Sequence, residues 1–394
     1  MSLIVSWAFR RGDELVCSSN AQKMTEHAPG LFAVSMFLGI VALHGGKIRR
    51  IILFILSTMS AFLAFRFIAC IRPIELGSLA GLFILLWTIH MVNLLFLDDR
   101  IPPEQARRLD TRLVRILFDY RGYARGHRGT GRRPRERPEI LPWLCQRLAT
   151  TLCIVAIFAL YILVLEEVLG TTHADFAPSK QTILRRIPEA TSHEVMIRIW
   201  TVFHAFYSNW VIFAVVQHAL ASIRVILECD EPDYFTAFHG RVTQAYTIRR
   251  FWGFFWHKLT ERDFAALGRL ISHRVAGLQP GTVAARRCEE FNAFLISGVV
   301  HAMITVQLGF NCGYMEDILF FCLNYAAILA EELVQQTISP YVGKWKNGPV
   351  GKGLGFLWVY GFFFWSLPKQ QYPKIYCGIA GSRGNSGYSG AHRD

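Results

Sequence analysis

The chain has 394 residues, of which 52% are hydrophobic and 18% charged, with 42 Lys and Arg against 29 Asp and Glu. Soluble domains carry about a quarter charged residues, so this chain lacks the polar surface that a soluble protein of its size requires. The mean hydropathy of +0.29 and the pI near 9.5 argue against a nucleic-acid-binding protein, whose positive charge would lie on a polar surface. The composition indicates an all-α polytopic membrane protein with a basic face.

Cysteine spacing and the first residues give no sign of an exported, disulfide-rich domain. The nine cysteines are odd in number and never spaced as C-x-x-C, so we expect neither a disulfide framework nor a zinc site, and no metal. They are interpreted as small apolar core residues. Asp13, Glu14 and Glu26 precede any long apolar run, so no cleaved signal peptide is predicted.

Apolar segments long enough to cross a bilayer recur along the chain. A transmembrane helix needs about 20 mainly apolar residues, so we expect about eight spans, within a range of about seven to nine, plus interfacial helices. The expected spans are 31–44, 51–71, 75–97, 148–170, 195–227, 291–312, 315–338 and 354–370.

The loops between these spans differ in charge. Most of the 42 Lys and Arg residues lie in one set of alternating loops, which includes the long segments 98–147 and 228–290. Because cytosolic loops carry the excess of basic residues, this set is predicted to be cytosolic and both chain ends lumenal. We expect a multi-pass protein of the endoplasmic reticulum membrane.

The chain is predicted to form a single membrane-embedded domain over residues 1–376. Residues 98–147 form a basic loop rich in Gly, Pro and Arg, interpreted either as a flexible tether on anionic lipid or as part of the site for an anionic substrate. The Gly- and Ser-rich tail 377–394 is expected to be disordered.

One ionisable residue in the middle of a predicted span is the first candidate for chemistry. His301 shares a helix face with Ser297 and Thr305, at spacings of one turn each, in an otherwise apolar segment. Ionisable residues inside spans are costly and are therefore functional candidates. A desolvated neutral imidazole can accept a proton from an alcohol. The alternative is a structural histidine bonded to a neighbouring helix.

The cytosolic stretch 247–264 combines aromatic and basic side chains. The residues of interest there are Arg249, Arg250, Trp252, Trp256, His257 and Lys258. Such a mixture is typical of a helix at the membrane interface, which is the simpler interpretation. The later appearance of His301 makes His257 a second candidate.

Two further spans carry polar stripes. One contains His204, Ser208, His218 and Ser222, and the other contains Asn324, Glu331 and Gln335. Each stripe can line a buried aqueous chamber or pair one helix with another. Three polar stripes in one chain favour a central chamber. No G-x-S-x-G, H-E-x-x-H or P-loop motif occurs, which disfavours a serine hydrolase, a zinc protease or a nucleotide hydrolase.

The run TIRRFWGFFWH at 247–257, followed by SGVVH at 297–301, resembles the wax synthase-type branch of the membrane-bound O-acyltransferases. Trp358, the segment 365–368 and Tyr372 are similar to the closing pattern of that branch, so the resemblance covers residues 240–373. At Phe254 and Phe255 the chain differs, because members of the branch often carry arginine there. Its fungal members include acetyltransferases of terpenoid and meroterpenoid biosynthesis, and the chain looks closest to these.

This resemblance implies transfer of an acyl group from coenzyme A to a hydroxyl, with His301 as base and His257 assisting. We expect acetyl-CoA as co-substrate, no permanently bound cofactor, and an acceptor that is a hydrophobic hydroxylated small molecule arriving through the lipid bilayer. From their location, the expected contacts of coenzyme A are Arg249, Arg250 and Lys258 for the phosphates and Trp252 or Trp256 for the adenine. The expected substrate cavity includes Ser297, Thr305, Asn324, Glu331 and His204.

Two alternatives remain open from the residues. One is a long-chain wax or sterol ester synthase, which differs only in the acyl donor. The other belongs to a different class, a proton-coupled transporter in which His204, His218, His301 and Glu331 form a relay. The oligomeric state is not predicted.

Overall fold

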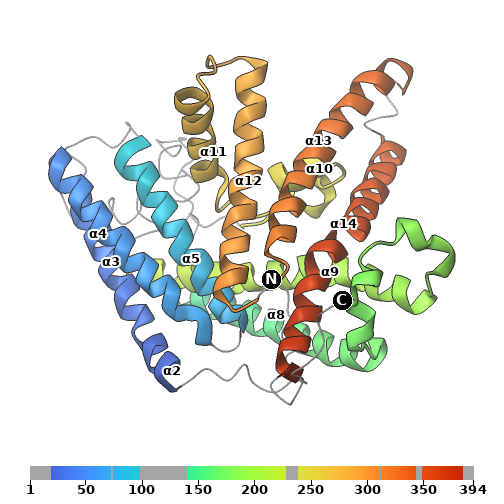
Figure 1. The fold of residues 1–394 in the computed structure, drawn as a ribbon, viewed down its shortest axis with the longest axis horizontal. Helices are drawn as coiled ribbons and strands as arrows, with labels where there is room; N and C mark the ends of the chain where they lie inside the picture. Colours follow the sequence, from blue (N-terminus) through green and yellow to red (C-terminus); the bar gives the residue numbers. More distant parts are fainter. Residues whose placement is uncertain are drawn as a thin grey trace, which may run out of the picture.

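The computed structural model describes residues 19–71, 74–97, 140–227, 238–310, 312–342 and 348–384, and every regular element within these ranges is a helix. The predicted all-α class is thus confirmed for the described residues. In Figure 1 the N-terminal helices lie together at the left, α12, α13 and α14 occupy the centre and right, and α8 and α9 run across them.

Short α2 (Ser19–Glu26) leads into the N-terminal group, which comprises α3 (Ala28–Leu43), α4 (Lys47–Arg66) and α5 (Ile74–Val92). Buried serines join α3 and α4: Ser57 Oγ donates to the Ser35 carbonyl at 2.8 Å, and Ser60 Oγ donates to the Leu31 carbonyl at 2.7 Å. Small residues that hydrogen-bond across a helix pair are favoured in membranes, where hydrophobicity alone does not drive helices together.

Helices α8 (Ile140–Leu169) and α9 (Ser192–Ile226) form a second pair. None of the apolar window of α8 is buried, as expected for a helix whose sides face lipid. Two side-chain hydrogen bonds join α8 to α9. Tyr161 Oη lies 3.1 Å from His204 Nδ1, and Thr151 Oγ1 lies 2.8 Å from His218 Nδ1.

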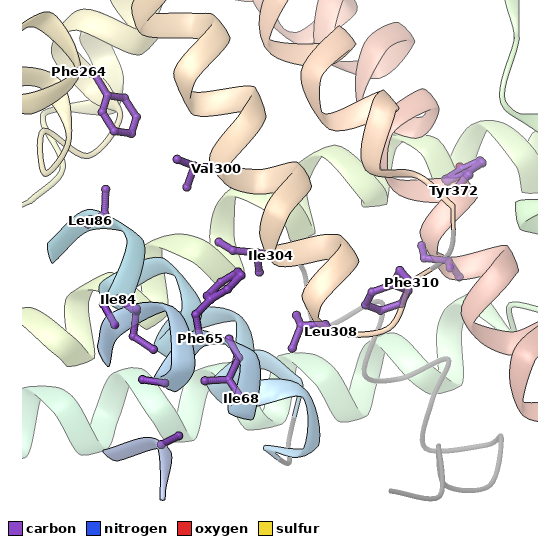
Figure 2. Close-up of a cluster of buried hydrophobic side chains, with 14 of the residues drawn as sticks. Phe65, Ile68, Ile84, Leu86, Phe264, Val300, Ile304, Leu308, Phe310 and Tyr372 are labelled. Carbon is purple, nitrogen blue, oxygen red and sulfur yellow. The ribbon is translucent and has the colours of Figure 1, made fainter. Parts of the chain in front are cut away.

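The C-terminal half supplies the remaining elements. They are α10 (Ile248–Arg250), α11 (Glu261–Leu270), α12 (Val283–Gln307), α13 (Tyr314–Val342) and α14 (Pro349–Gly384). A cluster of buried side chains joins α12 to the N-terminal group (Figure 2). Its members include Phe65, Ile84, Val300, Ile304, Leu308 and Tyr372. A second cluster packs α9, α10, α13 and α14 around Phe251 and Phe321. Helix α12 therefore lies between two hydrophobic cores.

Six helices among the described residues are long and apolar enough to cross a membrane. They are Lys23–Leu43, Lys47–Cys70, Leu76–Leu97, Ile140–Leu169, Ser192–Ile226 and Pro349–Cys377. These match six of the predicted spans. The other two, 291–312 and 315–338, correspond to α12 and α13, which fall outside this set. The exact number of spans stays a prediction.

Two expectations need correction or completion at the C-terminus. Cys312 and Cys377 form a disulfide and Cys70 is also disulfide-bonded, so the interpretation of the cysteines as apolar fillers was wrong for these three. Helix α14 continues to Gly384, so residues 377–384 of the expected disordered tail are helical. The rest of that tail, and residues 98–139 of the basic loop, lie outside the described residues.

The disulfide-bonded and the free cysteines lie in different segments of the chain. Cys70, Cys312 and Cys377 are disulfide-bonded. Cys70 ends a short 3-10 helix, Cys312 lies just before α13, and Cys377 lies within α14, all at positions predicted to be lumenal. Cys145 and Cys288, which are free, lie in segments placed in the cytosol. Disulfides persist in oxidising compartments and are rare in the cytosol. The orientation itself stays a prediction.

We expect unreduced protein to yield the Cys312 and Cys377 peptides as one linked species after alkylation and digestion, measured by mass spectrometry. Exposed Cys145 should be alkylated without reduction and serves as the internal control. Cys312→Ser should lower the free energy of unfolding by about 2–4 kcal/mol, the usual contribution of a native disulfide. Alkylation of Cys312 before reduction would contradict the assignment.

Candidate active site

The glycine of the S-G-x-x-H motif brings two central helices into backbone contact. A Cβ atom on Gly298 would lie 2.8 Å from the Cα of Ile318 on α13, closer than side-chain atoms approach in folded proteins. Only glycine permits this approach of α12 to α13. The motif therefore sets the distance between His301 and the helix that faces it.

His301 uses its ring face, and not its ring nitrogens, for packing. The imidazole stacks on Phe321 of α13, with ring centroids 5.0 Å apart and an angle of 18° between the planes. The side chain is half-buried, and no hydrogen bond joins it to another residue of the described ranges. An imidazole held by stacking on its ring face, with no hydrogen bond to the described residues, is suited to exchange a proton with a bound molecule.

The polar stripe of α12 continues into a buried carboxylate that the sequence analysis missed. Thr305 is 1% exposed and donates its hydroxyl to Asp317 Oδ2 at 2.6 Å. Asp317 Oδ1 accepts from Gln370 Nε2 at 2.8 Å and also pairs with Lys374, both from α14. An aspartate inside a predicted span was a signal that could have identified this residue. Ser297 is half-buried on the same stripe.

The aromatic motif forms a turn that begins at a capped helix end. Thr247 Oγ1 accepts the backbone N–H of Arg250 at 3.0 Å, and the chain then makes a π-helical turn over Phe251–Phe255. Such turns are rare and frequent at functional sites.

Glu331 holds this turn in place. Its carboxylate accepts the backbone N–H groups of Ile248 at 2.5 Å and Arg249 at 3.1 Å, as well as Trp358 Nε1 at 2.7 Å. Glu331 was predicted as a cavity residue. The structure gives it a bonding role that fixes the aromatic motif to α13 and α14.

A row of aromatic contacts connects the two histidines. Trp252 contacts Phe321, the ring under His301, at a centroid distance of 5.6 Å, and contacts Trp256 at 5.8 Å. Trp252 Nε1 also donates to Asn324 Oδ1 at 2.9 Å, which accounts for that residue of the α13 stripe. Trp256 in turn lies 5.3 Å from His257.

Among the described residues, His257 does not contact His301 directly and is separated from it by Trp256, Trp252 and Phe321. Its ring packs against Phe213 of α9 at 4.5 Å and against His239 at 6.1 Å. No contact in the described residues joins it to His301. The role of His257 in chemistry therefore stays a prediction.

The basic residues near the motif divide into two groups. Arg249 forms a bidentate pair with Glu290, with N–O distances of 3.0 and 3.1 Å, and also pairs with Glu332. The hydrogen bonds that Arg249 donates to Glu290 raise the pKa of Arg249, and the two glutamates balance its charge. Arg250 lies between the rings of Tyr246 and Phe254, at 4.6 and 4.7 Å.

Lys258 also lies over Phe254, at 5.8 Å. In the described part of the chain, no carboxylate pairs with Arg250 or Lys258. These two cations therefore differ from Arg249, whose charge is already balanced.

The remaining predicted residue, His204, is placed elsewhere. It is 1% exposed and bonded to Tyr161 of α8, so it joins two helices and does not reach His301 in any described contact. His218 is likewise bonded to Thr151. No group of three or more metal-binding side chains occurs within the ranges that the structure describes.

Residues 235–323 match the model of the membrane bound O-acyl transferase family. This range contains both His257 and His301. The resemblance predicted from the motifs is confirmed.

Several fungal proteins are similar to the chain. Acetyltransferase eriL of Hericium erinaceus is 30% identical over 189 residues, covering 47% of this chain and 48% of the relative. Acetyltransferase ple2 of Rhodocybe pseudopiperita is 32% identical over 200 residues, covering 48% and 50%. Acetyltransferase spyB of Aspergillus fumigatus is 33% identical over 121 residues, covering 30% and 20%. The chain thus spans about half the length of the first two relatives, or less for the third. No solved structure matches the chain.

We expect Glu331→Gln to destabilise the protein. An amide oxygen replaces one charged acceptor and an NH₂ group replaces the other, so at least one backbone N–H of the aromatic motif loses its partner. Hydrogen bonds to charged groups contribute about 1.5–3 kcal/mol, and the loss of free energy of unfolding should fall in this range. The measurement is the thermal unfolding midpoint in detergent.

The matched control is Glu189→Gln, the same chemical change at a glutamate whose side chain is 74% exposed. The midpoint of this variant should stay at the wild-type value. Equal midpoints for the two variants would contradict the bonding role of Glu331.

Proposed function

We propose that the protein is an O-acetyltransferase that transfers the acetyl group of acetyl-CoA to a hydroxyl of a terpenoid or meroterpenoid intermediate. The observation that carries this proposal is the placement of His301. Its ring is stacked on Phe321, its nitrogens make no hydrogen bond to the described residues, and it lies in the segment that matches the acyltransferase family. The names of the similar fungal proteins favour acetyl over a long acyl chain.

The proposed reaction is a single displacement. A ring nitrogen of His301 takes the hydroxyl proton as the acceptor oxygen attacks the thioester carbonyl carbon. The new C–O bond forms, the C–S bond breaks, and the thiolate of coenzyme A leaves. The imidazolium then returns its proton to the thiolate. No covalent enzyme intermediate is needed, and a donor from His257 or a nearby backbone N–H stabilises the developing oxyanion.

Coenzyme A is proposed to enter from the basic, cytosolic side. Arg250 and Lys258 have no described carboxylate partner and lie beside the ring of Phe254, so they suit an anionic phosphate better than Arg249 does. Trp252 and Trp256 offer ring faces nearby for the adenine. The hydrophobic acceptor is proposed to reach the same site from the bilayer of the endoplasmic reticulum.

The two alternatives predict different contacts or products. A relay for proton transport would join His204, His218 and Glu331 to His301, but the structure bonds each of the three to a separate partner. A wax or sterol ester synthase differs only in the donor, and products formed from acetyl-CoA and palmitoyl-CoA distinguish it.

Membranes that contain the wild type should convert labelled acetyl-CoA and a hydroxylated terpenoid into a labelled ester. His301→Ala should lower the rate at least about 100-fold, because general-base catalysis contributes roughly 10²–10⁴-fold. His193→Ala, at a histidine 43% exposed at the start of α9, is the matched control and should keep the wild-type rate. Full activity of His301→Ala would exclude the mechanism.

His257→Ala should reduce kcat more than it raises the KM for acetyl-CoA, because the proposed role of His257 is in the transition state. The expected reduction in kcat is about 10-fold or more, because the loss of one hydrogen-bond donor to the oxyanion lowers kcat by up to about 10²–10³-fold. Steady-state kinetics on the same membranes measure both constants. An unchanged kcat would leave His257 as a packing residue against Phe213.

A further inference from the structure

Asp317 is a buried charge that joins three helices. Its side chain is fully buried near the start of α13, where the positive end of the helix dipole favours a carboxylate. It accepts hydrogen bonds from Thr305 of α12 and Gln370 of α14, and it pairs with Lys374, which is 1% exposed. A carboxylate with this number of partners is firmly oriented.

The same carboxylate belongs to the surroundings of His301. Thr305 lies one turn after His301 on α12, and Phe321 lies one turn after Asp317 on α13. Phe321 stacks on the His301 ring, and Thr305 donates a hydrogen bond to Asp317. Two neighbouring contacts, one between rings and one hydrogen bond, therefore join α12 to α13 around His301. Asp317 also interacts electrostatically with His301.

The close approach at Gly298 reinforces this arrangement. A Cβ atom there would lie 3.4 Å from the carbonyl oxygen of Asp317, so the backbone of α13 at Asp317 lies against α12 near the histidine. Displacement of Asp317 would therefore change both the charge near His301 and the position of Phe321, the ring on which His301 stacks.

We propose that Asp317 is a positioning residue for the acyl transfer: it holds α12, α13 and α14 together around His301, and its negative charge stabilises the imidazolium that forms when His301 takes the acceptor proton. This inference rests on the function proposed above. Lys374 has a separate role, which is to balance the buried carboxylate in the resting protein.

A double-mutant cycle separates these two roles. Asp317→Asn leaves Lys374 buried without its partner, and Lys374→Met leaves Asp317 without its partner, so each single variant should lower the thermal midpoint. The double variant removes both charges, and its midpoint should recover toward that of the wild type. Catalysis should follow a different pattern, because it depends on Asp317 and not on the pair.

We expect kcat for ester formation, per folded protein, to fall about 10-fold or more in Asp317→Asn and to stay low in the double variant. The KM for acetyl-CoA should stay within about 2-fold of the wild type, because the proposed contacts of coenzyme A lie at the other end of the site. Lys374→Met should keep most of its kcat. Glu316→Gln, the same kind of change one residue earlier on α13, is the matched control and should keep wild-type stability and rate.

Recovery of kcat together with stability in the double variant would overturn the inference, because Asp317 would then act only through the fold. A wild type and Glu316→Gln that form no ester from any donor and acceptor pair would overturn the proposed function, and the role of Asp317 with it. Active controls with a slow double variant support both.

Discussion

The contact between α12 and α13 at Gly298 is the constraint on which the rest of the site depends. Because no side chain separates the two backbones there, the ring of Phe321 can lie against His301 and the hydroxyl of Thr305 can reach Asp317. A larger residue would have to move α13 as a whole, since the nearest atom is backbone and cannot rotate away. The S-G-x-x-H motif thus contains both His301 and Gly298, the glycine that lets Phe321 lie against the histidine ring.

The aromatic motif at 247–257 is joined to the α12–α13 contact through side chains of α13. Glu331 binds the backbone at the start of the aromatic turn, and Asn324 binds Trp252 within it. Both are on the polar stripe of α13, one turn or more from Phe321. Polar groups inside a membrane span need hydrogen-bond partners. Asn324 and Glu331 find theirs in the aromatic motif, so these two residues of the α13 stripe hold that motif in place and are less available to line a chamber.

Local patterns were sufficient to predict some of these features. The apolar segments located six long helices, and the spacing of Ser297, His301 and Thr305 predicted one polar face, because both depend on residues near one another in the sequence. The partners could not be predicted: Asp317 meets Lys374 and Glu331 meets Trp358 only after α13 and α14 pack. The same limit explains His204, whose stripe pairs with α8, and the disulfide between Cys312 and Cys377.

Helix α14 fixes α13 at two heights, and the spacing of the contacts shows that the two helices pack in one antiparallel register. Glu331 meets Trp358 in the second half of α13, and Asp317 meets Gln370 and Lys374 near the start of α13. At a rise of 1.5 Å per residue, these contacts are about 21 Å apart along α13 and about 18–24 Å apart along α14. Because the lengths agree, a shift of either helix by one turn would break both sets of bonds. Three residues after Lys374, the disulfide of Cys377 ties α14 to Cys312, which precedes α13. The polar bonds and the disulfide therefore oppose the same movement, which is the sliding of α14 along α13.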